Sequence, residues 1–318
     1  MTTRIEIRAE APGDEEAIDT VNCRAFGQMD EAHLVRLLRQ SSPGFDRRFS
    51  VTAFDGDLMV GHTLFNPANI RLMGATVRAL AVAPVAVLPE YQRQGIGGQM
   101  LAYGHELGKA EGFALAFLCG HPGYYPRHGY KACFGFASVK IDVEKLPEPG
   151  CRLHPWPVLA ADLPWLMERS AAEWADVDFS WQWGNCLSEW TRPGTNALIW
   201  RTDDGRRAAY TLGWPGRKKL KLVLADEPAM ARDAIATIKP EALEHHPAGW
   251  LARNALDGQW AAAEVKSSGA AMARELQDGV LAPLRGCPRC RQQAAGLLQL
   301  AGAAHALLKP PRPQRPRR

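Results

Sequence analysis

The sequence lacks an apolar run long enough to cross a lipid bilayer. Its longest apolar segments, such as residues 79–88, are far shorter than the ~20 residues that a membrane-spanning helix needs. The first residues, MTTRIEIRAE, are charged and carry no apolar segment of the secretory type. The seven cysteines are odd in number and scattered, so they do not form a disulfide framework. We therefore expect no membrane partner and a cytoplasmic, reducing location.

Excess charge of one sign is also missing, except at the C-terminus. The formal net charge is +4, but residues 309–318, KPPRPQRPRR, contain five basic side chains, without which the remainder is near −1. The body of the chain is therefore not a basic surface of the kind that binds nucleic acid. The tail has nothing apolar to bury, and we expect it to be disordered.

Tryptophan is absent from the first 155 residues, and all ten tryptophans lie between Trp156 and Trp260. The proline- and glycine-rich segment at residues 146–157 stands just ahead of this change and favours irregular backbone. We therefore predict a first α/β or α+β domain over residues 1–150 and a second lobe over 151–265. Helices are expected over residues 266–308, including 270–281 and 294–308, followed by the disordered tail at 309–318.

Two landmarks of the first half recur in the second half. Asp14 precedes a predicted helix and Asp55-Gly56 joins two predicted strands, a strong hairpin signal. Asp162 and Asp204-Gly205 repeat these features at offsets of 148 and 149 residues. The second lobe is thus interpreted as a duplicated unit. An unrelated α+β domain remains the alternative.

The most informative segment is VAVLPEYQRQGIGGQML, at residues 85–101. An apolar strand leads into a turn with Gly95, Gly97 and Gly98, and a helix with an apolar stripe follows at once. Glycines let the backbone approach a ligand, and the first helical N–H groups attract an anion such as a diphosphate. The Gly-Lys-Ser/Thr of a P-loop is absent. Met100 replaces the third glycine of a dinucleotide fingerprint.

The pattern Gln-x-x-Gly-x-Gly at Gln92 to Gly97 resembles motif A of the GCN5-related N-acetyltransferases. A second element, Tyr125-Pro-Arg-His-Gly129-Tyr130, is similar to the Tyr-x-x-x-Gly-Phe of that family. The resemblance implies a mixed central sheet with flanking helices, and acetyl-CoA as co-substrate with no metal. The acetyl-CoA site it implies comprises Val85, Ala86, Val87, Gln92, Arg93, Gln94, Gly95, Ile96, Gly97 and Gly98.

The resemblance also implies a mechanism. A primary amine, on a small molecule or a peptide, attacks the thioester in a ternary complex while strand amides stabilise the oxyanion. Tyr125 is implied as the acid that protonates the leaving thiolate, and Tyr124 is the competing residue. A phenol suits this role only if its surroundings favour the ionised form. The base stays open; the side chains weighed are Glu90, His121, His62, Asp30 and Glu31.

The second lobe has no glycine between Gly216 and Gly249, where a second phosphate-binding turn would lie. It resembles the degenerate lobe of tandem acetyltransferases, which walls the acceptor cleft. Its tryptophans form either a ligand wall or core. Cys287-Pro-Arg-Cys290 lacks the further ligands of a zinc site. The helix expected over 294–308 either packs on the body or pairs with a second copy of the chain. The alternative to an enzyme is a non-catalytic acetyl-CoA-binding module.

Overall fold

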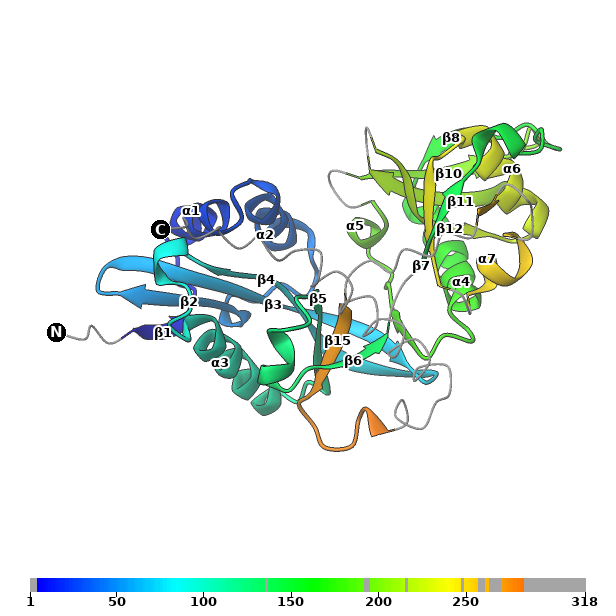
Figure 1. Ribbon diagram of the computed structural model, residues 1–318. Coiled ribbons are helices and arrows are strands. Elements are labelled where there is room, and N and C mark those ends of the chain that lie inside the picture. The colour runs from blue at the N-terminus through cyan, green and yellow to red at the C-terminus, as the bar shows by residue number, and fades with distance from the viewer. Residues whose placement is uncertain are drawn as a thin grey trace, which may run out of the picture.

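The computed structural model describes residues 5–134, 137–191, 195–214, 217–246, 249–256, 261–262 and 270–282. These residues form two lobes, each built around one sheet and its helices (Figure 1). Among them, no helix is long and apolar enough to cross a bilayer. Cys287, Cys290, the predicted helix at 294–308 and the basic tail lie outside the described residues.

The first sheet has one parallel pair, β4 with β5; its other strands pair antiparallel. In spatial order, its strands are β1 (Glu6–Ala9), β2 (Ser50–Asp55), β3 (Leu58–Leu72), β4 (Ala75–Val87), β5 (Leu115–Gly120), β15 (Ala270–Glu275) and β6 (Lys131–Phe134). Its helices are α1 (Glu15–Phe26), α2 (Asp30–Ser41) and α3 (Ile96–Ala110). Short 3-10 turns lie at Arg47–Phe49, Pro89–Tyr91 and Tyr125–His128.

The second sheet repeats this plan, again with one parallel pair, β12 with β13. Its order is β14 (Ala261–Ala262), β7 (Ala137–Ile141), β13 (Ala242–His245), β12 (Arg217–Ala225), β11 (Arg207–Trp214), β10 (Asn196–Arg201) and β8 (His154–Pro157). The helices are α4 (Leu163–Glu173), α5 (Leu187–Trp190), α6 (Pro228–Ile238) and α7 (Trp250–Asn254). As α3 connects the parallel strands β4 and β5, α6 connects β12 and β13. The second lobe thus repeats the plan of the first, as the two landmarks predicted.

The two landmark aspartates occupy equivalent local positions. The carboxylate of Asp14 accepts the N–H of Ala11 at 2.8 Å, and that of Asp162 accepts the N–H of Leu159 at 3.0 Å. Each also binds an arginine guanidinium, at 2.6 Å in both cases. Neither side chain caps its own helix, as an N-cap residue would. Each closes the turn ahead of the helix instead.

The lobes exchange strands. β6 and β7 are consecutive in the chain, yet β6 lies at the edge of the first sheet and β7 lies in the second, between β13 and β14. The place beside β5 in the first sheet is taken by β15, which pairs with β5 on one side and β6 on the other (Figure 1). The sheets therefore do not separate at the predicted boundary near residue 150.

The predicted helix over residues 270–281 is wrong, because Ala270–Glu275 is a strand and residues 276–281 form bends and turns. The sequence AAMARE favours a helix by local propensity alone. Pairing on both edges outweighs this preference, since a strand between two neighbours satisfies its backbone groups on both sides.

The tryptophans mostly build the core. Trp190 is fully buried, and Trp183 packs edge-on against it at 4.7 Å between ring centroids. β9 (Phe179–Trp181) pairs with β3, and Trp181 packs against Phe117 of the first sheet at 5.5 Å. The core interpretation therefore holds for these three, while Trp181 also borders a cavity between the lobes.

Candidate functional site

The glycine turn opens into α3. The backbone is left-handed at Arg93, with φ of 63°, and at Gly95, with φ of 82°, and this turns the chain sharply into the helix. The first backbone bond of the helix runs from Gln99 N–H to the Gly95 carbonyl at 3.1 Å. The N–H groups of residues 96–98 thus precede any intrahelical acceptor and present a partial positive charge. This end of α3 is built to hold an anion.

Two glycines of the turn are required by close packing. A Cβ on Gly97 would lie 2.6 Å from the Tyr124 hydroxyl, and one on Gly98 would lie 2.7 Å from Cε1 of His128. Tyr124 and His128 pack against each other at 4.7 Å between ring centroids. The backbone of the turn and these two rings therefore face each other across the site, and side chains at residues 97 and 98 would fill the space between.

The strand that leads into the turn diverges from its neighbour. β4 pairs with β5 only at residues 79–81, where Ala81 lies opposite Phe117. β4 nevertheless continues to Val87 and β5 to Gly120. A wedge-shaped gap therefore opens between the two strands over residues 82–87, directly beside the N-terminus of α3.

The backbone groups along this gap can be assigned from the pairing of β4 with β3. Leu88 donates its N–H to a carbonyl of β3 at 2.9 Å. Because such bonds alternate along an antiparallel pair, Ala86 faces β3, whereas Val85 and Val87 direct their N–H and C=O groups into the gap. In agreement, the Val87 carbonyl accepts Nε2 of Gln92 at 3.1 Å. Two strand N–H groups are thus available to a ligand there.

One cavity of about 930 Å³ joins the gap and the turn. Most of the residues predicted for the site line it, namely Val85, Val87, Gln92, Arg93, Gly95, Ile96, Gly97, Gly98 and Tyr125. Ala86 and Gln94 are not among its lining residues: Ala86 is buried against β3, and Gln94 donates its side-chain amide to the Glu90 carbonyl at 3.2 Å. The structure thus brings together all but these two.

Tyr125 stands at the end of β5. Its ring packs so closely on Gly120 that a Cβ there would lie 2.2 Å from the ring edge. Burial, with a smaller contribution from Tyr124, raises the pKa of Tyr125 to about 12. The surroundings therefore favour the protonated phenol, not the ionised form that the sequence argument required. Burial also raises the pKa of Tyr124.

Of the five candidate bases, two line the cavity and three do not. His121 and Glu31 line the cavity. His62 is fully buried between Asn22 and Ser50, each at 3.0 Å, and burial lowers its pKa to about 3. His62 is thus a neutral core residue.

Glu90 and Asp30 also lie outside the lining of the cavity. Glu90 forms an exposed ion pair with Arg24 at 2.9 Å. Asp30 is the first residue of α2 and is not among the lining residues.

Several lining residues were not predicted, among them the chemically reactive Cys119, Arg127 and His128. Arg127 and His128 belong to the segment that carried the family resemblance, which was a usable signal. Cys119 is the next-to-last residue of β5. Burial raises the pKa of its thiol, Glu244 of the second lobe raises it further, and Lys221 of that lobe lowers it. Glu244 is held by Lys219 at 2.8 Å. Charged side chains of the second lobe therefore lie near enough to Cys119 to affect its pKa, a proximity with no local sequence signal.

The equivalent helix end in the second lobe is poorly suited to an anion. Asp226 and Glu227 directly precede α6, where the first lobe has its glycine turn. Asp226 accepts Nε1 of Trp165 at 3.0 Å and binds Arg169 at 3.2 Å, while Glu227 pairs with Arg206 at 3.2 Å. Pro228, which has no N–H, opens this helix, and the two carboxylates lie just ahead of it, so this end is a poorer diphosphate site than the glycine turn. The predicted loss of a second phosphate site is explained.

Comparison with known proteins agrees with this geometry. Residues 6–133 match the family described as Acetyltransferase (GNAT) domain. The uncharacterized N-acetyltransferase YjhQ of Escherichia coli K12 is 36% identical over 122 residues, which cover 38% of this chain and 67% of YjhQ. The uncharacterized N-acetyltransferase YhbS of the same strain is 31% identical over 131 residues, which cover 41% of this chain and 74% of YhbS.

Both lobes share their fold with solved structures. A GCN5-related N-acetyltransferase from Kribbella flavida matches with a TM-score of 0.66 at 15% identity, covering 87% of this chain and 73% of that one. That likeness concerns the fold alone, whereas the two relatives from E. coli also share sequence, over 122 and 131 residues. The chain therefore belongs to the GCN5-related N-acetyltransferase (GNAT) family.

Proposed function

We propose that the protein transfers an acetyl group from acetyl-CoA to a primary amine by direct attack in a ternary complex. The observation that carries this proposal is the gap between β4 and β5, where the N–H groups of Val85 and Val87 lie beside the open N-terminus of α3. Such a site offers hydrogen-bond donors to a thioester arm and a positive helix end to a diphosphate.

The cavity fits acetyl-CoA on two counts. The N–H groups at the start of α3 precede any helical acceptor, and Gly97 and Gly98 line the cavity without a side chain that would cover these groups. The residues that would hold the diphosphate are Arg93, Gly95, Gly97 and Gly98, and the pantetheine arm would lie along Val85 and Val87. Acetyl-CoA supplies the activated acyl group; orientation and proton transfer fall to the protein.

In the proposed reaction the amine nitrogen bonds to the carbonyl carbon, the carbon–sulfur bond breaks, and the sulfur leaves with its electron pair. Fixed N–H donors stabilise the negative charge that develops on the carbonyl oxygen. Tyr125 would donate its proton to the departing sulfur. Its raised pKa keeps that proton in place at neutral pH and makes the transfer uphill by about 3.5 pKa units against a thiolate of ordinary pKa about 8.5, so the ionised phenol would be a transient species. The amine must also lose a proton, and Glu31 and His121 are the weighed bases that border the cavity.

The test begins with a calorimetric titration of acetyl-CoA into wild-type and Gly97→Glu protein. The glutamate places both bulk and negative charge at the proposed diphosphate site, so we expect binding by the wild type and none by the variant. Gly150→Ala is a matched control, because its nearest neighbour is a carboxylate oxygen at an ordinary 3.8 Å. Release of free thiol is then measured with a panel of amines. Binding without turnover on any amine would favour a non-catalytic acetyl-CoA-binding module instead.

A further inference from the structure

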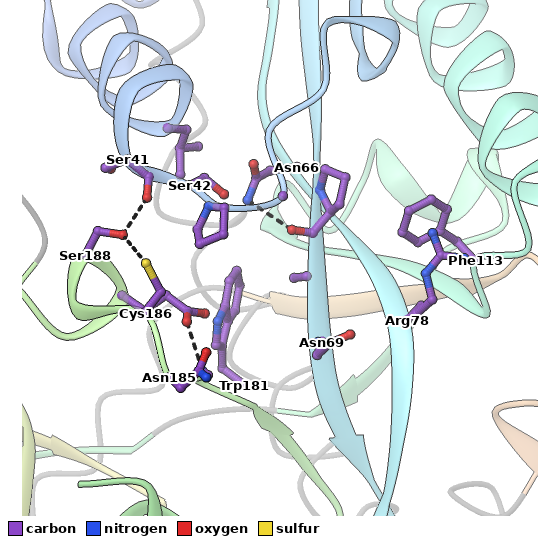
Figure 2. A pocket seen from close by; sticks show the side chains of 17 residues that line it. Ser41, Ser42, Asn66, Asn69, Arg78, Phe113, Trp181, Asn185, Cys186 and Ser188 are labelled. Atoms are coloured by element: carbon purple, nitrogen blue, oxygen red, sulfur yellow. Dashed lines mark hydrogen bonds between the residues drawn. The ribbon is translucent and has the colours of Figure 1, made fainter. Parts of the chain in front are cut away.

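A second cavity lies at the junction of the two lobes. It has a volume of about 410 Å³ and is bordered by the end of α2, the middle of β3 and the segment after β9 (Figure 2). β2 pairs with β3 only as far as Leu64, and β9 begins to pair at Ile70. The cavity therefore sits against the stretch of β3 between its two neighbours.

Asn66, in that stretch, has an unsatisfied buried atom. The side chain is only 4% exposed, and its Nδ2 donates to the Pro67 carbonyl at 3.5 Å. Within the described residues, its Oδ1 has no hydrogen-bond partner. A buried acceptor without a donor carries a desolvation penalty. A ligand in the cavity that donates an N–H or O–H to this oxygen would remove that penalty.

The charged side chains of the cavity are already engaged. The Arg78 guanidinium donates to the Glu111 carbonyl at 3.0 Å, and the Glu189 carboxylate accepts the Gly184 N–H at 3.0 Å. The remaining polar wall consists of uncharged groups. Among them, the Ser188 hydroxyl donates to the backbone carbonyl of Ser41 at 2.8 Å. The cavity is thus suited to a neutral hydrogen-bonding group and not to an anion or a cation.

One face of α2 runs from the first cavity to the second. Glu31 and Leu34 line the first cavity, whereas Leu38 and Ser41 line the second. Spacings of three and four residues place all four side chains on the same face of the helix. At 1.5 Å per residue, Leu34 and Ser41 are about 10 Å apart along the helix axis.

The sheet beneath α2 links the cavities in the same direction. Ala83 is exposed and lines the first cavity, and Ala81, two residues earlier on β4, is half-buried. Ala81 is the register partner of Asn66 on β3, so the two are neighbours in the sheet. Alanine side chains are small and leave room above this part of the sheet. Ala83 and Ala81 of β4 therefore lie in sequence between the proposed acetyl site and Asn66.

We propose that the acceptor is an elongated primary amine whose far end carries a neutral hydroxyl or amide N–H donor. Its amine would lie in the first cavity beside Val85 and Val87, and its far end would donate to Oδ1 of Asn66 in the second. This inference rests on the proposed acetyl transfer, since it names the acceptor class of that same site.

Three amine probes test the proposal through the rate of thiol release from acetyl-CoA. They are ethanolamine, the eight-carbon ω-amino alcohol aminooctanol, and nonylamine, which replaces the distal hydroxyl by a methyl group. We expect wild-type kcat/KM to be at least about tenfold higher for aminooctanol than for nonylamine, because only the alcohol satisfies the buried oxygen. Asn66→Leu should abolish this preference and leave the rate with ethanolamine unchanged.

Two further variants sharpen the result. Asn66→Asp keeps the shape but adds a negative charge, so it should shift the preference from aminooctanol to the eight-carbon diamine, whose far end is a cation. Asn196→Leu, at an exposed asparagine of β10, is the matched control and should keep the wild-type preference. If thermal unfolding shows that Asn66→Leu does not fold, Asn66→Ser replaces it, since serine is small and polar.

The other possible results distinguish failure of the Asn66 subsite from failure of the proposed acetyl transfer. Equal use of aminooctanol and nonylamine by the wild type would overturn the Asn66 subsite while acetyl transfer stands. If no amine releases thiol, acetyl transfer fails, and calorimetric titration of the same two amines then decides on the subsite. Binding of aminooctanol in preference to nonylamine, lost in Asn66→Leu, would support the subsite; equal binding would overturn it.

Discussion

The Tyr124 hydroxyl lies 2.6 Å from the position that a Cβ on Gly97 would occupy, and the next atom of the ring lies 3.7 Å away. The conflict with a side chain at residue 97 is therefore almost entirely a conflict with one oxygen atom. Because only one oxygen atom is involved, the effects of Gly97 and of Tyr124 on acetyl-CoA affinity can be measured separately.

We predict that Gly97→Ala weakens acetyl-CoA binding by roughly tenfold or more, since the methyl group and the hydroxyl cannot share the space and one must intrude on the site. Removing the hydroxyl should relieve the conflict, so Gly97→Ala/Tyr124→Phe should recover most of the affinity. Calorimetric titration of acetyl-CoA into both variants measures this. Equal weakness of the single and double variants would show that Gly97 is needed for another reason.

Tyr125→Phe should lower kcat by about a hundredfold, the usual range for losing a positioned general acid, with acetyl-CoA affinity within about twofold of wild type. Tyr124→Phe is the matched control and should keep most of the turnover. Steady-state kinetics with a saturating amine, together with calorimetry, separate the two effects. Undiminished kcat in Tyr125→Phe would remove this residue from the mechanism.

The pH profile gives an independent readout on Tyr125. A pKa of about 12 means that the phenol keeps its proton throughout the range in which the amine becomes neutral. We therefore expect kcat to show no decline between pH 8 and 10 in the wild type. A fall with an apparent pKa near 9 that disappears in Tyr125→Phe would mean that the surroundings lower the pKa once acetyl-CoA is bound.

His62 should make the fold sensitive to acid. Its pKa is about 3 in the folded protein and ordinarily 6.5, so between these values only the unfolded chain takes up the proton. Stability is therefore retained above pH 6.5 and lost as the pH falls below it, by about 1.4 kcal/mol between pH 7.5 and 5.5 for this one group. Urea unfolding at these two pH values should show this loss reduced by a similar amount in His62→Gln.

His33→Gln, at an exposed histidine of α2, is the control for that measurement and should leave the pH dependence of the unfolding free energy unchanged. If His62→Gln shows the full wild-type loss, His62 is not the group that takes up the proton. His105 is a second candidate, because burial also lowers its pKa to about 3.

A chain that ends at residue 150 should not form a stable first lobe. It would lack β15 and leave β5 and β6 each with an unpaired edge, which favours aggregation. Gel filtration and circular dichroism should show aggregated or non-cooperatively unfolding protein, and a peptide of residues 270–282 should restore a cooperative transition. A monomeric, cooperatively unfolding product without the peptide would show that the sheet can close without β15.

The sequence correctly predicted those helices, strands and turns that are determined by residues close together in the chain. The Asp55-Gly56 hairpin, the strand that ends at Val87 and the helix that begins at Ile96 are all present. Their signals are local: turn residues, apolar periodicity and glycines at fixed spacing. The same signals predicted most of the cavity lining, because the turn and the end of β4 are consecutive in the chain.

The features that the sequence did not predict depend on contacts between segments far apart in the chain. β15 is alanine-rich and pairs only because two strand edges some 140 residues earlier are open to it. The approach of Glu244 to Cys119 and the second cavity beside Asn66 likewise depend on how the lobes pack. Hydrophobic periodicity identifies a strand or a helix but not its partner, so these features were out of reach.

The exchange of β7 and β15 also determines when each lobe can finish folding during synthesis. The ribosome releases β1 to β6 first, yet the first sheet stays incomplete until residue 275 has emerged, after every element of the second lobe. The proposed acetyl site, which includes the end of β5, is therefore completed only when synthesis of both lobes is nearly over. A polypeptide stalled midway cannot acquire a finished acetyltransferase lobe, and the two halves must mature as one unit.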